Sequence, residues 1–326
     1  MTSQSNTSIE AQDISKEPRY DPSIYDTPFA KLPDPKRVWL GEPNSRLEGL
    51  GRLTLLTPEV VSAAAASEIK TGRRVGLNWD MTKLEYSQFG RQKCAHKIIP
   101  LLGPGGTGMG ACFDDAYSMN PQQSSQWDGF RHYSQPRNSK DHWTSKDRVF
   151  YGGTTKSEIF DSSNHRIGIQ HWADEGIAGR AILLDYALWA STQSPPIEYT
   201  TFSTHTIPFK TLLEVAKFHN IAPRRGDILF IRTGVMRDWE AMTDEQKQAY
   251  AAQEEPQHAG VEPSMEVLEW IWDSGFSAVA SDAISWEVFP QMGDISLHEY
   301  FLAGWGLPIG VSYVEGHLIG DAKEKY

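Results

Sequence analysis

The segment Asp227-Ile-Leu-Phe-Ile-Arg-Thr-Gly234 is a short apolar run that ends in a turn signal. Two further runs of this kind are AILLDY at 181–186 and SAVASDA at 277–283. Short, nearly continuous apolar runs are typical of strands that are buried on both faces of a sheet. Helical patterns at 208–220 and 263–274 lie between and beside these runs. The alternation of strand and helix predicts an α/β domain with a largely parallel or mixed sheet.

The first half of the chain is less regular. Thr57 is a good N-cap and Pro58 suits the first helical position, so we expect a helix from there to about Thr71. Residues 73–79, RRVGLNW, are predicted to form a strand. Residues 80–160 have no clear periodicity, and a loop-rich stretch of this length usually carries function.

Composition limits the organisation and the partners of the protein. The chain has 326 residues, no repeat of fixed period and no clean linker, which favours a single domain over residues 21–326. Residues 1–20 are polar and are predicted to be a disordered tail. With 31 Lys and Arg against 42 Asp and Glu, the formal net charge is −11. This charge opposes binding to nucleic acid or to an anionic membrane surface.

Cysteine usage and hydropathy indicate a cellular compartment. Cys94 and Cys112 are the only cysteines, too few for a disulfide framework or a cysteine-rich zinc site. No apolar run reaches the length of about 18 residues that a membrane span needs. The N-terminal segment has no apolar core of a secretory signal. These features favour a cytoplasmic protein.

A glycine-rich segment offers one alternative function. Gly103, Gly105 and Gly108 form a literal G-x-G-x-x-G, the pattern of a dinucleotide-binding loop. That interpretation needs a strand before the loop and a helix after it, and the residues that follow have no helical periodicity. A flexible loop is the better interpretation, and a dinucleotide-dependent oxidoreductase stays as a minor alternative.

The polar segment from Gln122 to His132, QQSSQWDGFRH, carries the strongest functional signal. If this part is extended, side chains alternate between faces with a period of two. One face then presents Gln122, Ser124, Gln126, Asp128 and His132. Polar groups that converge in this way commonly line a ligand site. The competing interpretation is a solvated turn, because Asp-Gly is a typical hairpin dipeptide.

This segment resembles the signature His-x-Gly-Thr-His-x-Asp-x-Pro-x-His of the cyclase family typified by kynurenine formamidase. In that alignment Gln122 and Gln126 replace two histidines, whereas Asp128 and His132 match. The form Ser-Gln-Trp-Asp-Gly-x-Arg-His is similar to the branch of the family found in fungi. Further segments resemble the family in the same order, so that the likeness spans roughly residues 75–320: 176–185, 226–234, 277–287 and 297–310.

The resemblance implies a swivelling β/α/β fold with a mixed central sheet flanked by helices, assembled as a homodimer or homotetramer. It also implies hydrolysis of an amide, lactam or ester beside an aromatic ring. In metal-dependent members, the two histidines and the aspartate of the signature bind Zn²⁺ or Mn²⁺. Carried over to this chain, Asp128 and His298 remain as candidate metal ligands. Because a glutamine offers only a neutral carbonyl oxygen, we expect either no metal or a weakly bound Mn or Zn ion.

The sequence therefore predicts a small-molecule hydrolase or cyclase that acts on a small aromatic substrate by acid–base chemistry. His132 is the predicted acid/base, Asp128 its carboxylate partner and Gln126 an amide donor to a substrate oxyanion. We expect the substrate to lie against a further set of residues: Gln122, Trp127, Phe130, Tyr151, Phe89 and Tyr86. The alternative is a catalytically inactive family member that binds an aromatic metabolite or a partner.

Overall fold

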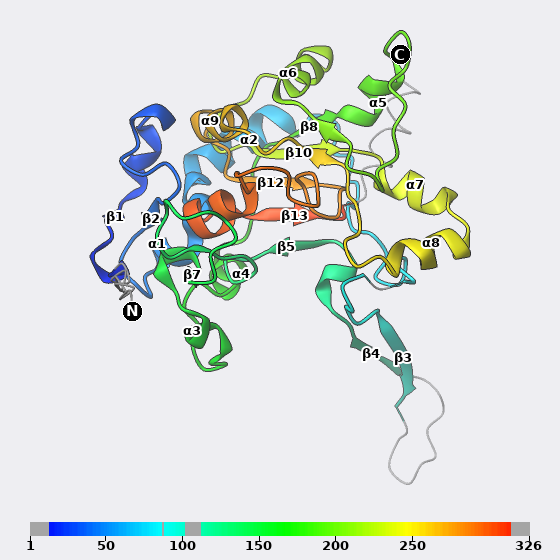
Figure 1. Cartoon of the computed structure of the whole chain (residues 1–326), viewed down its shortest axis with the longest axis horizontal. Coiled ribbons are helices and arrows are strands. Elements are labelled where there is room, and N and C mark those ends of the chain that lie inside the picture. Colours follow the sequence, from blue (N-terminus) through cyan, green and yellow to red (C-terminus); the bar gives the residue numbers. More distant parts are fainter. Residues whose placement is uncertain (1–12, 87, 102–111, 314–326) are drawn as a thin grey trace, which may run out of the picture.

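The computed structural model describes residues 13–86, 88–101 and 112–313. Its centre is a five-stranded sheet in the order β5-β13-β12-β10-β8 (Figure 1). The strands are β5 (Gln126–Asp128), β13 (Ile309–Val311), β12 (Ala278–Ser281), β10 (Ile228–Arg232) and β8 (Ala181–Asp185). Four of them run parallel, and the edge strand β5 pairs antiparallel with β13. The predicted mixed sheet is thus confirmed.

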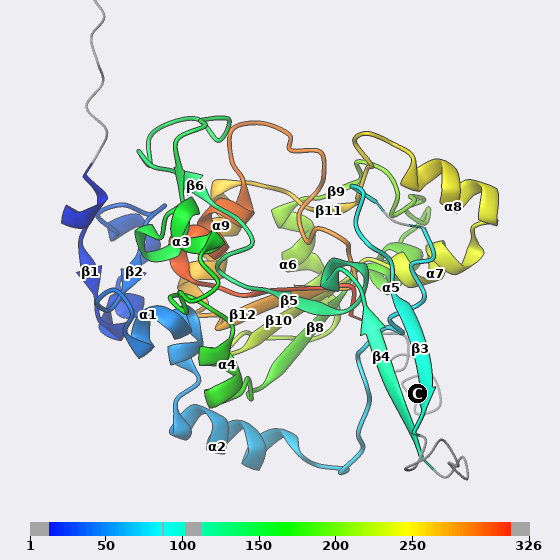
Figure 2. The same cartoon turned by 90° about the horizontal axis from the view of Figure 1, so that it is seen from below.

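Both faces of this sheet are buried, which explains the continuous apolar runs in the sequence. In β10, Leu229 and Ile231 belong to one hydrophobic cluster, while Ile228 and Phe230 belong to another. This division follows the period of two along a strand. Figure 2 shows α6 and α9 on one side of the sheet and α2 and α4 on the other. The central sheet is therefore flanked by helices, as expected.

Side-chain caps mark the starts of several helices. Thr57 caps α2 through the N–H of Val60, and Thr243 forms a capping box with Gln246 at the start of α8. The α-helices are α1 (Arg46–Leu50), α2 (Pro58–Glu68), α3 (Lys156–Phe160), α4 (Gln170–Glu175), α5 (Tyr186–Ser191), α6 (Phe209–Phe218), α7 (Val235–Ala241), α8 (Asp244–Ala251) and α9 (Met265–Asp273). A π-helix, η8 (Glu299–Trp305), follows His298.

The remaining strands form small two-stranded pairings. They are β1 (Arg19–Tyr20) with β2 (Trp39–Leu40), β3 (Ala95–Pro100) with β4 (Phe113–Ser118), β6 (Gln135–Pro136) with β7 (Arg148–Val149), and β9 (Thr206–Ile207) with β11 (Gly260–Val261). The β3–β4 ribbon projects from the body of the molecule in both views (Figures 1 and 2). All twelve of its residues are exposed.

Some expectations fail or lie outside the described residues. The strand predicted for residues 73–79 is wrong, because this segment has no partner strand apart from an isolated bridge between Asn78 and Tyr313. The glycines at 103, 105 and 108 lie outside the described residues. So do residues 1–12 of the predicted tail, whereas residues 13–20 form a 3₁₀ turn and β1. Within the described ranges, no helix is long and apolar enough to span a bilayer.

Candidate functional site

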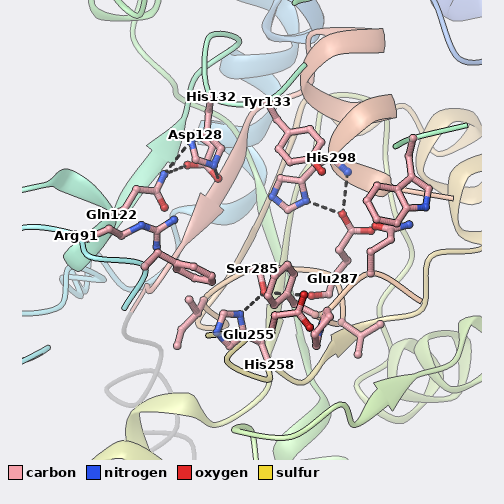
Figure 3. Close-up of a pocket in the computed structure, with 17 residues that line it drawn as sticks. Arg91, Gln122, Asp128, His132, Tyr133, Glu255, His258, Ser285, Glu287 and His298 are labelled. Atoms are coloured by element: carbon pink, nitrogen blue, oxygen red, sulfur yellow. Dashed lines mark hydrogen bonds and ion pairs between the residues drawn. The ribbon is translucent and has the colours of Figure 1, made fainter. Parts of the chain in front are cut away.

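A cavity of about 480 Å³ gathers three polar residues of the signature and several residues from distant parts of the chain. This volume suits a small organic molecule. Its walls come from residues 89–91, from the signature segment at 122–133, from Trp143, and from residues 255–258, 284–291 and 298 (Figure 3). Asp128, His132 and His298 all line it.

The polar residues of the signature converge, though not because they form one long strand. Gln122 lies in a short 3₁₀ turn, strand β5 covers only residues 126–128, and a turn from Gly129 brings His132 back. Nε2 of Gln122 donates to Oδ1 of Asp128 at 2.5 Å, and Nε2 of Gln126 donates to the same oxygen at 2.6 Å. The predicted cluster therefore forms around one carboxylate.

His132 lies at the open side of this cluster. Its Nε2 is 3.8 Å from Oδ2 of Asp128, and its Nδ1 is 3.3 Å from Nε2 of Gln122. The pKa of His132 is lowered because burial disfavours the charged ring; Asp128 opposes this effect, whereas His298 and Arg91 add to it. His132 is therefore neutral near pH 7 and can accept a proton.

Ser124, which shared the predicted polar face, takes a different role. Its hydroxyl donates to the carbonyl oxygen of Trp79 at 2.9 Å, and the residue is 3% exposed. It fixes the loop before β5 rather than lining the cavity.

A second carboxylate–histidine pair faces the first across the cavity. Nδ1 of His298 lies 2.7 Å from Oε1 of Glu287, and Glu287 also accepts from the backbone N–H groups of Leu297 and His298. Burial opposes a charge on His298, but the hydrogen bond and charge of Glu287, together with Asp128, outweigh it and raise the pKa of His298. The rings of His132 and His298 are 6.5 Å apart between centroids.

A third histidine on the wall is buried and neutral. Nδ1 of His258 lies 2.6 Å from Oγ of Ser285, and the side chain is 2% exposed. Burial and the nearby charge of Arg91 lower the pKa of His258 to about 3. Arg91 also lines the cavity. Nothing in the local sequence pattern pointed to four of these wall residues: Arg91, His258, Ser285 and Glu287. Glu287 offered a signal only through the family resemblance, since it ends the family-like segment 277–287.

The apolar part of the wall differs from the predicted set. Phe89 and Gln122 do line the cavity, and they are joined by Trp143 and Phe289. The rings of Phe89, Trp143 and Phe289 can hold a flat aromatic group.

The other four residues predicted to contact substrate do not line this cavity. Phe130 and Tyr151 are fully buried and pack against each other in the core. Trp127 points to the opposite face of β5 and packs against Tyr313. Tyr86 belongs to a separate hydrophobic cluster and accepts a hydrogen bond from Gln248. The structure thus places these four side chains away from this cavity, because an aromatic residue near the signature in sequence can equally well fill the core.

The donor set does not suit a tightly held divalent metal. Both glutamines direct amide N–H groups, which cannot ligate a cation, at Asp128. Within residues 13–86, 88–101 and 112–313, no group of three or more His, Cys, Asp and Glu side chains is arranged to hold a metal ion. The side chains at this site therefore do not fit the metal that the family resemblance implies.

Comparisons with known proteins agree with this fold. Residues 77–288 match the family model described as "Putative cyclase". A solved structure described as a novel cyclase is 22% identical with a TM-score of 0.69, covering 86% of this chain and 88% of that one. An isatin hydrolase bound to the product analogue thioisatinate is 11% identical with a TM-score of 0.50, covering 81% and 88%. A search of curated proteins finds no match. At these identities the solved structures show a shared fold.

Proposed function

Because this chain belongs to the cyclase family, we propose that it is a small-molecule hydrolase or cyclase that acts on an aromatic substrate in the cavity beside His132. The observation that carries the proposal is the convergence of Asp128 and His132 in a cavity that also presents aromatic side chains. A reaction of this kind needs a group that moves protons next to a bound planar molecule.

The proposed role of His132 follows from its surroundings. A neutral imidazole removes a proton from the nucleophile, which is water in hydrolysis and a substrate hydroxyl in ring closure. The new bond forms at the substrate carbonyl carbon. The proton then passes from His132 to the nitrogen or oxygen that leaves. Asp128, with Oδ2 at 3.8 Å, stabilises the imidazolium between these two steps.

The substrate class follows from the wall of the cavity. Phe89, Phe289 and Trp143 provide apolar surface for a ring, and the polar side chains of Gln122, His132 and His298 line the same cavity. Within the amides, lactams and lactones, the resemblance to kynurenine formamidase favours an aryl formamide. Gln126 contacts Asp128 instead of lining the cavity, so we do not retain it as an oxyanion donor.

The same observations support a second candidate, a catalytically inactive family member that binds an aromatic metabolite. The two glutamines at the positions of family histidines motivate it, because loss of metal ligands is a common way to lose metal-dependent hydrolysis. In that case the cavity binds the ligand and His132 serves only as a hydrogen-bonding group.

Turnover of three probes separates these candidates. N-formylkynurenine, isatin and dihydrocoumarin present a formamide, a lactam and an aromatic lactone. We expect the wild-type protein to convert at least one of them, and the His132→Ala variant to lose about 10²-fold or more in kcat. Binding without conversion would favour the inactive binder. Conversion that survives intact in the variant would exclude His132 as the acid/base.

A further inference from the structure

Asp128 is held by two neutral donors. Gln122 and Gln126 both donate an amide N–H to the same oxygen, Oδ1, at 2.5 and 2.6 Å. The residue is only 3% exposed, so its carboxylate depends on protein groups for hydrogen bonds. The other oxygen, Oδ2, faces His132. Oδ1 of the carboxylate thus accepts the hydrogen bonds that hold Asp128 in place, and Oδ2 stays available to His132.

The orientation of both amides follows from charge. An amide oxygen turned toward a carboxylate oxygen would place two acceptors in contact, whereas the NH₂ group supplies a donor. Hydrogen bonds to an ionised acceptor are about twice as strong as those between neutral groups. An NH₂ group has no electron pair to offer to a cation. The two side chains nearest Asp128 therefore present hydrogens at the place where a metal site needs ligand atoms.

We propose that the amides of Gln122 and Gln126 replace a metal ion at this site and act as positioning residues for Asp128, so that the protein works without a bound divalent metal. A metal would offset the charge of Asp128 and fix its direction. The two amides stabilise the carboxylate and fix its direction through hydrogen bonds. The inference deepens the proposed function, because it gives Asp128 the role of partner to His132 rather than of metal ligand.

The close approach of both glutamines to one carboxylate oxygen provides a direct test. A histidine at each of these positions would bring two imidazoles to Asp128, and imidazole with carboxylate is a common ligand set for Zn²⁺ and Mn²⁺. The double variant Gln122→His/Gln126→His should therefore gain a metal site. Adding Asp128→Asn to it keeps both new histidines and removes the charged ligand, which makes it the matched control.

The measurement is calorimetric titration of ZnSO₄ and MnCl₂ into metal-free protein, followed by elemental analysis after dialysis. We expect the wild-type protein to retain no metal, the double variant to bind one equivalent at least about 100-fold more tightly, and the triple variant to lose most of that gain. Circular dichroism checks that each variant is folded. No substrate is present, so failure here is distinct from failure of the proposed reaction.

Two results would overturn the inference. Tight, stoichiometric binding by the wild-type protein would show that the glutamines do not prevent metal binding. A folded double variant that binds no more tightly than the wild type would show that positions 122 and 126 do not converge on Asp128. If the double variant fails to fold, the isosteric Gln122→Glu/Gln126→Glu variant tests the same convergence through Mn²⁺ binding, since three carboxylates would then face one another.

Discussion

Two carboxylate–histidine pairs line the same cavity, and they are built differently. Asp128 and His132 are 3.8 Å apart, and their contact relies on side chains alone. Glu287 and His298 are 2.7 Å apart, and Glu287 also binds two backbone N–H groups at the start of η8. In the proposed reaction the first pair moves the proton, whereas the second also fixes the course of the chain. Under that proposal, similar residue types serve chemistry in one place and architecture in the other.

Removal of the His132 side chain should have the largest effect of all. It should lower activity and leave stability nearly unchanged. We expect His132→Ala to lower kcat/KM by about 10²–10⁴-fold, because the group proposed to accept the proton and return it to the leaving group is then missing. The side chain is 32% exposed, so the free energy of unfolding should change by less than about 0.5 kcal/mol. Steady-state kinetics and urea unfolding measure the two effects. A large loss of stability in His132→Ala would contradict the distinction drawn between the Asp128–His132 pair and the Glu287–His298 pair.

Removal of the charge of Glu287 should act on stability. Glu287→Gln replaces a carboxylate oxygen by an NH₂ group that faces backbone N–H donors, so we expect a loss of about 3 kcal/mol in the free energy of unfolding. The matched variant is Asp128→Asn. An asparagine oxygen can still accept from both glutamines, so its loss should stay below about 1 kcal/mol. Equal losses in urea unfolding would contradict this difference.

The buried histidine His258 extends the comparison to pH. Its folded-state pKa is about 3, and an unfolded histidine titrates near 6.5. The unfolded chain therefore binds the extra proton as the pH falls below about 6.5, and stability is lost in that direction. Between pH 6.5 and 5 the contribution of this group is about 2 kcal/mol. Urea unfolding at both pH values should show this loss in the wild type and a smaller one in His258→Gln.

The smallest expected effect is a shift in a pH profile. Since burial and the charges of His298 and Arg91 outweigh Asp128 in lowering the pKa of His132, the acidic limb of kcat/KM should lie below pH 6.5. Arg91→Met removes one of these positive charges, which makes protonation easier and moves the limb to higher pH by up to about one unit. The exposed Arg237, as Arg237→Met, is the control. A shift of the acidic limb to lower pH in Arg91→Met would contradict this prediction.

More of the fold than of the site could be predicted from the sequence. The strands at 181–185, 228–232 and 278–281 were recognisable because each is mostly buried and therefore mostly apolar, with only Ala181 exposed. The β3–β4 ribbon gave no such signal, because its residues are exposed and of mixed character. Residues 73–79 look strand-like in isolation, but a strand also needs a partner, and that depends on tertiary structure.

The polar cluster could be predicted in part. The convergence of Gln122, Gln126, Asp128 and His132 was expected from an extended segment, but a 3₁₀ turn and a second turn bring the first and last of them together. Glu287 and His258 were missed because they reach the cavity from segments far away in the sequence. Their approach is fixed by the order of the strands rather than by any local pattern.

The pairing of β5 with β13 governs when the site can form during synthesis. Asp128 lies opposite Ile309, so the strand that carries it finds its sheet neighbour only after residues 309–311 have been made. Most of the chain must be made before the walls of the cavity come together. Until then, one edge of the growing sheet stays open, with apolar β12 at its border. A nascent chain that stalls between residues 282 and 309 would thus be prone to aggregate and would lack the completed cavity.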